Sequence, residues 1–205
     1  MLRRLKEAIY GAIALHRRSN CPHMRYIHRQ AFPMSDRKHS FPPVVAPDTR
    51  LLVLGSLPGE RSLAAARYYA HPQNQFWQLI SPAAGRDLVP LPYPERLEAL
   101  LAARIGLWDV VASATRPGST DAALRDIEPH DIAALAAALP ALRAIAFNGA
   151  TAQRHGLRQL GDAATRYTIL GLPSSSPLHT IGFAAKAPAW AALSAFCQPQ
   201  NGANA

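Results

Sequence analysis

The chain has 205 residues, of which 49% are hydrophobic, and it carries a net charge of +9 at pH 7. That size and apolar content fit one domain with a real core and a short appendage, while the charge indicates a polyanionic partner, nucleic acid or an anionic membrane surface, unless it serves only solubility. The two cysteines, Cys21 and Cys197, exclude a disulfide framework and a four-cysteine iron–sulfur cluster, and no apolar run reaches the roughly 18 residues of a membrane span.

Residues 1–40 form a basic extension whose pattern differs from the rest of the chain. Within it, residues 2–16 fit a short amphipathic helix, so a role at a membrane surface is one alternative for this segment. The sequence around Met34 resembles an ordinary translation start. We therefore hypothesise that the native product begins there, which mass spectrometry of the native protein would decide. We expect a folded domain over residues 41–198 and a disordered tail over 199–205.

Short apolar runs alternate with helical patterns from residue 50 onward. Four runs closed by turn residues predict buried parallel strands, over 50–57, 106–111, 143–149 and 166–175. Helical patterns cover 60–69, 74–80, 131–139 and 187–197, with Asp131 as the N-cap of the third and Pro188 in the first turn of the last. Strands separated by helices predict an α/β fold of three layers, α/β/α, around a four-stranded parallel sheet.

The loops that follow these strands contain unusual residues. They read GSLPG (55–59), ATRPGSTD (114–121), FNG (147–149) and LPSSSPLHT (172–180). In a parallel sheet, ligands bind beyond the carboxyl ends of the strands. We therefore expect these four loops to lie together on one rim and to form the site.

Several catalytic chemistries are disfavoured by residue spacing. GSLPG lacks both the Lys-Ser/Thr of a P-loop and the spacing of a dinucleotide site, which favours a tight turn over a nucleotide cofactor. No nucleophilic serine elbow is present. Four histidines are scattered along the chain without the i, i+4 spacing or the cysteine partners of zinc ligands, namely His71, His130, His155 and His179. We expect neither a cofactor nor a metal.

Residues 68–77, YYAHPQNQFW, concentrate aromatic side chains in a chain with only 7% of them. Phe76 and Trp77 fall on the same helical face as Ile80, which predicts that they belong to the core. Asn74 lies where that helix begins. Its amide either caps the helix or faces a ligand, and the spacing alone leaves both open.

Taken together, these motifs resemble the uracil-DNA glycosylase superfamily, and within it the hypoxanthine-DNA glycosylases, also called DNA-deoxyinosine glycosylases. The resemblance covers about residues 41–196 and rests on GSLPG, YYAHPQNQFW, GLWDVV, FNG and LPSSSP in this order. It implies a four-stranded parallel sheet between helices. It also implies a monomeric enzyme without cofactor that hydrolyses the N-glycosidic bond of deaminated bases in double-stranded DNA, in the cytoplasm of a bacterium and associated with the nucleoid.

The resemblance assigns hypoxanthine as the expected base, with uracil or xanthine as further substrates in base excision repair. Two alternatives stay open: a mismatch-type uracil or thymine glycosylase, and a non-catalytic DNA-binding module of the same fold. The only lysines are Lys6, Lys38 and Lys186, and none lies in the four loops. A Schiff base needs a desolvated lysine in the pocket, so such an enzyme would use water.

The resemblance also assigns roles to residues. It implies that Asn74 is the main catalytic group, positioning a water or contacting the scissile sugar or the departing base, and that Tyr69 stacks on the base after it leaves the duplex. The expected base pocket adds the first loop and the end of the third strand, namely Gly55, Ser56, Leu57, Gly59 and Asn148. For Asn148, a left-handed turn residue before Gly149 is the alternative.

Contacts to DNA are expected from the last loop. Its residues Ser174, Ser175 and Ser176 would bind phosphates, while Pro177 and Leu178 would wedge into the space left by the extruded nucleotide. Arg116 is expected either to bind phosphate or to form an exposed salt bridge. The basic surface would supply further phosphate contacts.

Two departures from the faster relatives affect the expected substrate. Efficient uracil enzymes carry an aspartate in the first loop and a histidine in the last, where this chain has Leu57 and Leu172. His179 lies further along and is not expected to take that histidine's role. The asparagine typical of mismatch-specific enzymes is also absent at Leu57. These departures favour a base that leaves more easily than uracil, or a slower enzyme.

Overall fold

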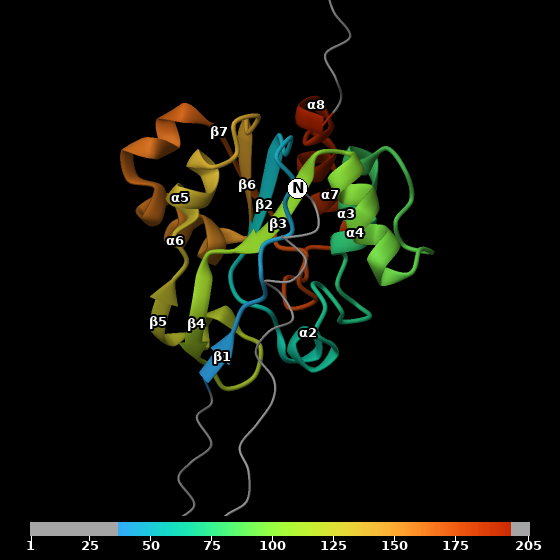
Figure 1. Ribbon diagram of the computed structural model, residues 1–205. Helices are drawn as coiled ribbons and strands as arrows, with labels where there is room; N and C mark the ends of the chain where they lie inside the picture. The colour runs from blue at the N-terminus through green and yellow to red at the C-terminus, as the bar shows by residue number, and fades with distance from the viewer. Residues whose placement is uncertain (1–36, 198–205) are drawn as a thin grey trace, which may run out of the picture. The chain divides into compact units, whose positions relative to one another are not determined.

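A four-stranded parallel sheet forms the centre of the computed structural model, which describes residues 37–197 (Figure 1). Its strands lie in the order β3 (Ile105–Asp109), β2 (Leu51–Gly55), β6 (Ala144–Asn148) and β7 (Thr168–Leu172). This confirms the predicted α/β fold and its four parallel strands. The helix expected over 2–16, the start at Met34 and the tail over 199–205 lie outside the described residues.

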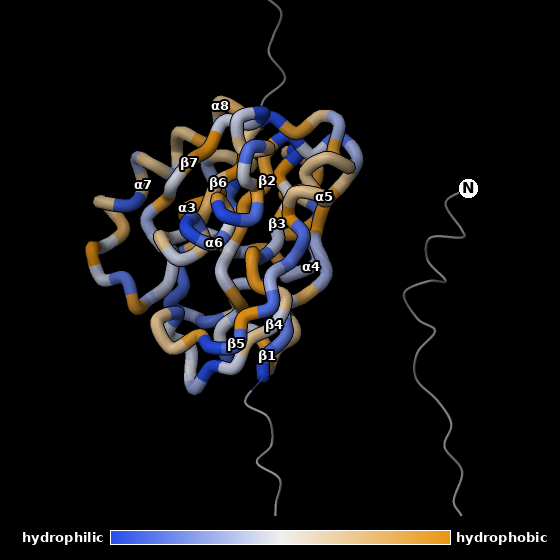
Figure 2. The backbone as a smooth tube through the Cα atoms, turned by 90° about the vertical axis from the view of Figure 1, so that its left-hand side faces the viewer, coloured by the Kyte–Doolittle hydropathy of each residue, from blue (hydrophilic) through white to orange (hydrophobic). Residues whose placement is uncertain are grey.

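Alternation along the central strands divides the core into two layers. Leu51 and Val53 of β2 pack in one apolar cluster, and Leu52 and Leu54 pack in the other. All four side chains are fully buried, because successive residues of a strand point to opposite faces and helices cover both faces here. Figure 2, which is coloured by hydropathy, shows hydrophobic residues along β2.

Helices cover the two faces of the sheet separately. One side holds α3 (Phe76–Ala84), α4 (Tyr93–Ala102), α7 (Phe183–Ala191) and α8 (Ser194–Cys197), and the other holds α5 (Ile132–Ala137) and α6 (Ala150–Leu160) (Figure 1). Phe76, Trp77 and Ile80 are buried in the first cluster, as predicted. The Asp131 side chain accepts a hydrogen bond from the backbone N–H of Ala134, which confirms the predicted N-cap.

A second, antiparallel sheet was not predicted. Its strands lie in the order β1 (Arg37–His39), β4 (Val111–Thr115) and β5 (Arg125–Pro129), and β4 follows β3 after a single residue. Because β1 pairs with β4, the folded domain already includes residues 37–40, which were assigned to the basic extension. Figure 1 shows this sheet beyond the same end of the central sheet as α2 (Glu60–Ala65).

Several helix boundaries differ from the predictions. The helix predicted from Asn74 begins at Phe76 and extends to Ala84, and the closing helix begins at Phe183, so Pro188 lies inside it rather than in its first turn. The helices α4 and α6 were not predicted from the periodicity. Two short 3₁₀ helices, η1 (Asp121–Ala123) and η2 (Gly161–Arg166), complete the described elements.

Gly156 of α6 lies directly against the fully buried ring of Phe147 on β6. A Cβ atom at this position would overlap that ring, so a helix with any larger residue here cannot approach the sheet as closely. We predict that Gly156→Ala lowers the free energy of unfolding by about 1–3 kcal/mol, although alanine is the better helix former by about 1 kcal/mol. Urea denaturation would measure this change. The exposed Arg158→Ala on the same helix is the matched control, and equal stability of the two variants would contradict this packing.

Candidate active site

A cavity of about 400 Å³ opens at the carboxyl ends of the central strands. That is within the range of pockets for small ligands. It is lined by the first loop, residues 119–122, Asn148 and residues 174–179, so the expected loops do meet on one rim. Residues 60–62, 68, 69, 71, 74 and 109 complete the wall. Every residue expected in the base pocket therefore lines one cavity, namely Gly55, Ser56, Leu57, Gly59, Tyr69 and Asn148, together with Asn74.

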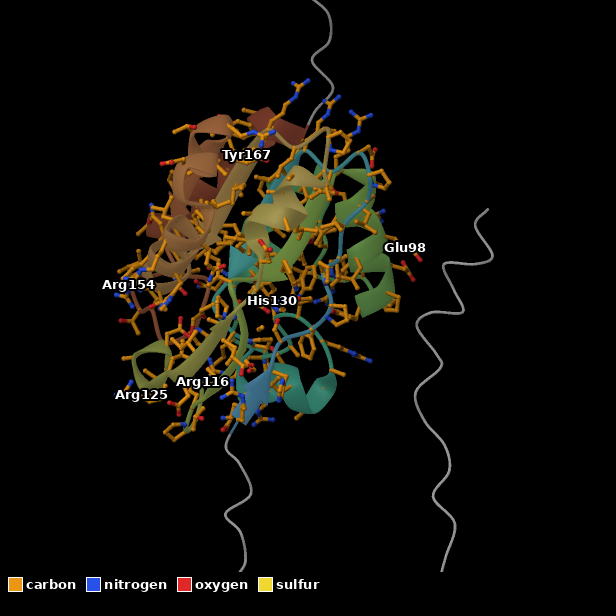
Figure 3. The ribbon with its side chains drawn as sticks, turned by 60° about the vertical axis from the view of Figure 1, so that its left-hand side comes forward. Glu98, Arg116, Arg125, His130, Arg154 and Tyr167 are labelled. Carbon is orange, nitrogen blue, oxygen red and sulfur yellow. The ribbon has the colours of Figure 1, made fainter. Side chains whose placement is uncertain are left out.

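Arg116 holds the first loop from inside the protein. Its guanidinium donates hydrogen bonds to the carbonyl oxygens of Leu57 (3.2 Å), Pro58 and Gly118 (3.1 Å). It also lies 3.5 Å from the carboxylate of Asp121. The side chain is fully buried, so the expectation that Arg116 binds phosphate or forms an exposed salt bridge is wrong. In Figure 3, Arg125 and Arg154 lie at the left-hand edge of the molecule, and Arg116 lies further in.

The same contact orders the opposite wall of the pocket. Asp121 accepts a hydrogen bond from the Ser56 hydroxyl at 2.8 Å, and Ser119 accepts one from the backbone N–H of Glu60 at 3.0 Å. Lys38 donates to Glu60 at 2.8 Å and to the carbonyl of Gly118 at 2.9 Å. The first loop is thus joined on several sides to residues 118–121, which restricts its conformation before any ligand binds.

Tyr69 stands in the pocket on an unusual backbone. Its φ angle is +53°, in the left-handed region that non-glycine residues rarely adopt and that costs of order 1–3 kcal/mol. The ring stacks on Phe76 with centroids 3.7 Å apart and planes 9° from parallel. Since Phe76 is fully buried, this stack fixes the Tyr69 ring against the core. Burial raises the pKa of the phenol, and the Asn148 side chain opposes that shift only in part, so the phenol is neutral.

Asn74 both caps a helix and faces the cavity. Its Oδ1 accepts a hydrogen bond from the backbone N–H of Phe76 at 2.9 Å, and its own N–H donates to the carbonyl of His71 at 2.9 Å. The side-chain NH₂ makes no hydrogen bond within residues 37–197, and the residue lines the pocket. Asn74 can therefore both cap the helix and face a ligand, because its oxygen forms the cap and its NH₂ group is left for the ligand.

Asn148 is held by the last loop. Its Nδ2 donates to the hydroxyl of Ser175 at 2.8 Å, and its Oδ1 accepts from the backbone N–H of Ser175 at 2.8 Å. Ser175 is fully buried and its carbonyl accepts from the N–H of Gln75 at 3.1 Å. The expectation that Ser175 binds a DNA phosphate is therefore wrong. Instead it joins the end of β6 to the residues before α3, and it occupies both polar ends of the amide that was expected to read the base.

The rest of the last loop, from residue 173 onward, is half-buried or exposed. Ser174 and Ser176 accept hydrogen bonds from the backbone N–H groups of Ser176 and Leu178, both at 3.2 Å, so the turn is built by its own hydroxyls. Each of these hydroxyls keeps its proton for another acceptor. Leu178 is 62% exposed and Ile181 is 51% exposed. Two apolar side chains thus project from the rim, where Leu178 was expected to act as a wedge.

Asp109 is a pocket residue that the sequence reading did not identify. It ends β3, lines the cavity and is only 3% exposed. Ser40 donates a hydrogen bond to its Oδ2 at 2.6 Å. Burial raises the pKa of this carboxyl to about 7, and the Ser40 hydrogen bond only partly opposes that shift. The sequence does contain a signal for it. Asp109 is an aspartate at the carboxyl end of an apolar strand, and ligands of a parallel sheet bind at that end.

Leu57 and Leu172 are both 5% exposed, and of the two only Leu57 lines the cavity. His71 and His179 stand at its edge. Within residues 37–197, no group of histidine, cysteine and acidic residues could hold a metal ion, and no helix is long and apolar enough to cross a membrane. The polar groups that line the cavity include the Asn74 amide, the Tyr69 phenol and the Asp109 carboxyl group.

Comparison with known proteins agrees with this arrangement. A family model described as the uracil DNA glycosylase superfamily matches residues 42–194. A protein named hypoxanthine DNA glycosylase from Methanosarcina barkeri (strain Fusaro) is 42% identical over 113 residues, covering 55% of this chain and 72% of the relative. One of the same name from Methanosarcina acetivorans is 40% identical over 141 residues, covering 68% and 86%. Both sources are archaea, so the expectation of a bacterial protein gains no support.

A solved structure is similar as well. The solution structure of a candidate uracil DNA glycosylase from Methanosarcina acetivorans superposes with a TM-score of 0.68 at 36% sequence identity. The match covers 78% of this chain and 98% of that one. The central sheet and the helices on both of its faces are therefore shared over nearly the whole of that protein.

A substitution of Arg116 tests whether this side chain supports the first loop. We predict that Arg116→Lys lowers the free energy of unfolding by about 2–4 kcal/mol, because one ammonium cannot reach three carbonyls and a carboxylate in the geometry of the guanidinium. Guanidinium chloride denaturation would measure the loss, with the exposed Arg154→Lys as control. Unchanged stability would contradict the role of this guanidinium in holding the two loops together.

Proposed function

The chain belongs to the uracil DNA glycosylase superfamily, and on that premise we propose that it hydrolyses the N-glycosidic bond of hypoxanthine in DNA. The two relatives named hypoxanthine DNA glycosylase support this assignment. The observation that carries it is the joint position of Asn74 and Tyr69 in a cavity that has the size of a nucleobase site. Such enzymes must take the target nucleotide out of the duplex before they can act on it.

The aromatic ring of Tyr69 is the proposed platform for the extruded base. Phe76 covers one face of that ring, and Tyr69 lines the cavity. The stack on a buried side chain means that little conformational freedom is lost when a base binds. Stacking of a base on an aromatic side chain contributes about 1–3 kcal/mol and tolerates different bases, so selectivity must come from hydrogen bonds at the base edge.

Asn74 is the proposed catalytic group. An amide does not take up a proton near neutral pH, so it acts by holding water or by donating a hydrogen bond from Nδ2. In the reaction, the oxygen of a water forms a bond to C1′ while the bond from C1′ to the base nitrogen breaks. The electron pair of that bond leaves with the base. Because the Asn74 oxygen is fixed by the N–H of Phe76, the NH₂ group is already oriented when the substrate arrives.

The two leucines disfavour uracil as the principal substrate. Leu57 is apolar and faces the cavity where faster relatives carry an aspartate, and Leu172 is buried where they carry a histidine. Without an anion to stabilise the developing charge on the sugar, the bond must break with less assistance. Hypoxanthine suits this pocket better because its two rings spread the negative charge of the leaving group. Uracil and xanthine remain proposed minor substrates.

DNA contacts are proposed from the exposed part of the last loop and from the surrounding basic surface. The hydroxyls of Ser174 and Ser176 can donate to phosphate oxygens, and Leu178 can fill the gap left in the duplex. A monomer bound in this way would leave an abasic site in double-stranded DNA for later steps of base excision repair. The positive charge implies that binding weakens as salt concentration rises.

A base-release assay on Asn74 variants tests this function. We predict that Asn74→Ala lowers kcat/KM on a duplex with one deoxyinosine by at least about 100-fold, because the oriented donor is lost. Alkali cleavage of abasic sites would measure it. Asn74→Ser keeps an oxygen that can accept from Phe76 N–H, so an equal loss in this variant would assign the effect to the amide rather than to the cap, which contributes about 1 kcal/mol.

Gln73→Ala is the matched control, because Gln73 is exposed beside Asn74 and does not line the cavity. It should retain wild-type activity. Both Asn74 variants should still bind a duplex that contains an abasic analogue. Full activity of Asn74→Ala would place catalysis elsewhere in the pocket. Binding without base release by the wild-type protein would mean a DNA-binding module that has lost the chemistry.

A further inference from the structure

We infer that Asp109 acts as a neutral carboxylic acid at the floor of the pocket and donates a hydrogen bond from Oδ1 to the carbonyl oxygen that deamination places on the base. This inference rests on the proposed function and names the group that recognises the leaving base. In this role the carboxyl contacts the base, which makes Asp109 a catalytic residue as well as a determinant of specificity.

Asp109 differs from the other acids of the pocket in forming no ion pair. Glu60 pairs with Lys38 at 2.8 Å, and Asp121 lies 3.5 Å from Arg116. In the described part of the chain, no basic side chain forms an ion pair with Asp109. Burial without an ion pair favours the protonated form of this carboxyl group, which is 3% exposed.

The contacts of Asp109 determine which of its oxygens carries the proton. Ser40 donates its hydroxyl proton to Oδ2 at 2.6 Å, so Oδ2 serves as the acceptor. Oδ1 lies against Gly55, where any Cβ atom would overlap it, and the Tyr69 hydroxyl lies beside the same glycine. Glycine at position 55 therefore leaves Oδ1 open toward the cavity that Gly55 and Tyr69 also line. A proton on Oδ1 is the donor that this side chain offers to a ligand.

Ser175 restricts what Asn148 can offer to a base. It accepts from Nδ2 of the amide and donates to its Oδ1, which leaves one N–H of Nδ2 for another partner. The Asp109 carboxyl and the Tyr69 hydroxyl both lie beside Gly55, so Asp109 offers a further donor at the end of β2. A flipped base is read along its Watson–Crick edge. Hypoxanthine presents an oxygen there, where adenine presents an amino group that cannot accept a hydrogen bond.

The same hydrogen bond assists the reaction. As the bond between C1′ and N9 breaks, its electron pair passes into the base and spreads to the carbonyl oxygen. A donor to that oxygen therefore binds more strongly in the transition state than in the ground state. Water supplies a hydroxyl group to C1′ and a proton, by way of solvent, to the departing base. Asp109 keeps its own proton throughout, so no further reactant is needed.

The titration of Asp109 follows from its surroundings. Ser40 and Arg116 favour the ionised form, whereas burial and Asp121 favour the protonated form, and burial has the largest effect. Tyr68 and Tyr69 pack nearby with raised pKa values and stay neutral. The resulting pKa of about 7 means that the donor is present below neutral pH and is lost as pH rises. Activity should therefore fall at alkaline pH.

Two substitutions at Asp109 test this, measured as kcat/KM for hypoxanthine release between about pH 6 and pH 9. Wild type should lose about tenfold per unit above pH 7. Asp109→Asn carries a permanent N–H donor, so we predict activity close to wild type at pH 6 and no alkaline decline. Asp109→Leu has no donor, so its kcat/KM should be about 100-fold below the wild-type value at pH 6 and should not change with pH. The exposed Asp162→Asn should decline as wild type does.

The stability of Asp109→Asn shows whether the variant is folded. In wild type the folded-state pKa of Asp109 lies above the ordinary value of 3.8. The contribution of Asp109 to the free energy of unfolding is therefore fully present at acid pH and falls as pH rises toward 7. Asparagine lacks this loss, and the variant should melt at a higher temperature than wild type at pH 8.

An alkaline decline that persists in Asp109→Asn would overturn the inference, since it would then belong to the substrate or to another group. Activity that rises with pH and is lost in Asp109→Asn would also overturn it, because the carboxylate would then be acting as a base. If wild type releases no hypoxanthine at any pH, the proposed function fails and this inference fails with it. Release by wild type with either Asp109→Asn result leaves the proposed function intact.

Discussion

The guanidinium of Arg116 lies between two loops, and the pocket takes its shape from that contact. By binding the carbonyls of Leu57, Pro58 and Gly118, it fixes how the chain turns after β2 and how residues 118–121 lie against that turn. A buried cation is costly unless all of its donors are satisfied, so the two loops cannot move apart without exposing it or leaving it unpaired. The wall of the pocket is therefore set before substrate binds.

Neutral groups dominate the chemistry of this pocket. The Asn74 amide, the Tyr69 phenol and the protonated Asp109 carboxyl can orient water, stack on a base and donate hydrogen bonds, but none supplies a full negative charge to the sugar. Such a site depends on the leaving group to accept electrons. Hypoxanthine accepts them better than adenine, and this difference links the absence of an acid at Leu57 to the proposed substrate. The energy of catalysis would come from preorganised donors.

Sequence patterns predicted the sheet and the meeting of its loops, because buried parallel strands give continuous apolar runs such as Leu51–Gly55. The sequence patterns gave wrong expectations for residues whose burial depends on contacts with distant parts of the chain. Arg116 and Ser175 look like solvent-exposed loop residues, yet both are fully buried by partners far away in the chain. Asp109 was missed because it ends an apolar run, and β1 was missed because its three residues are polar and only their pairing with β4 makes them a strand.

Direct identification of the released base would test the central claim most sharply. Purified protein in excess over a duplex with one deoxyinosine should release free hypoxanthine, identified by its mass, in equal amount to the abasic sites formed. A matched duplex with deoxyadenosine at the same position should release no adenine. Strand cleavage without free hypoxanthine, or equal release of both bases, would contradict the account.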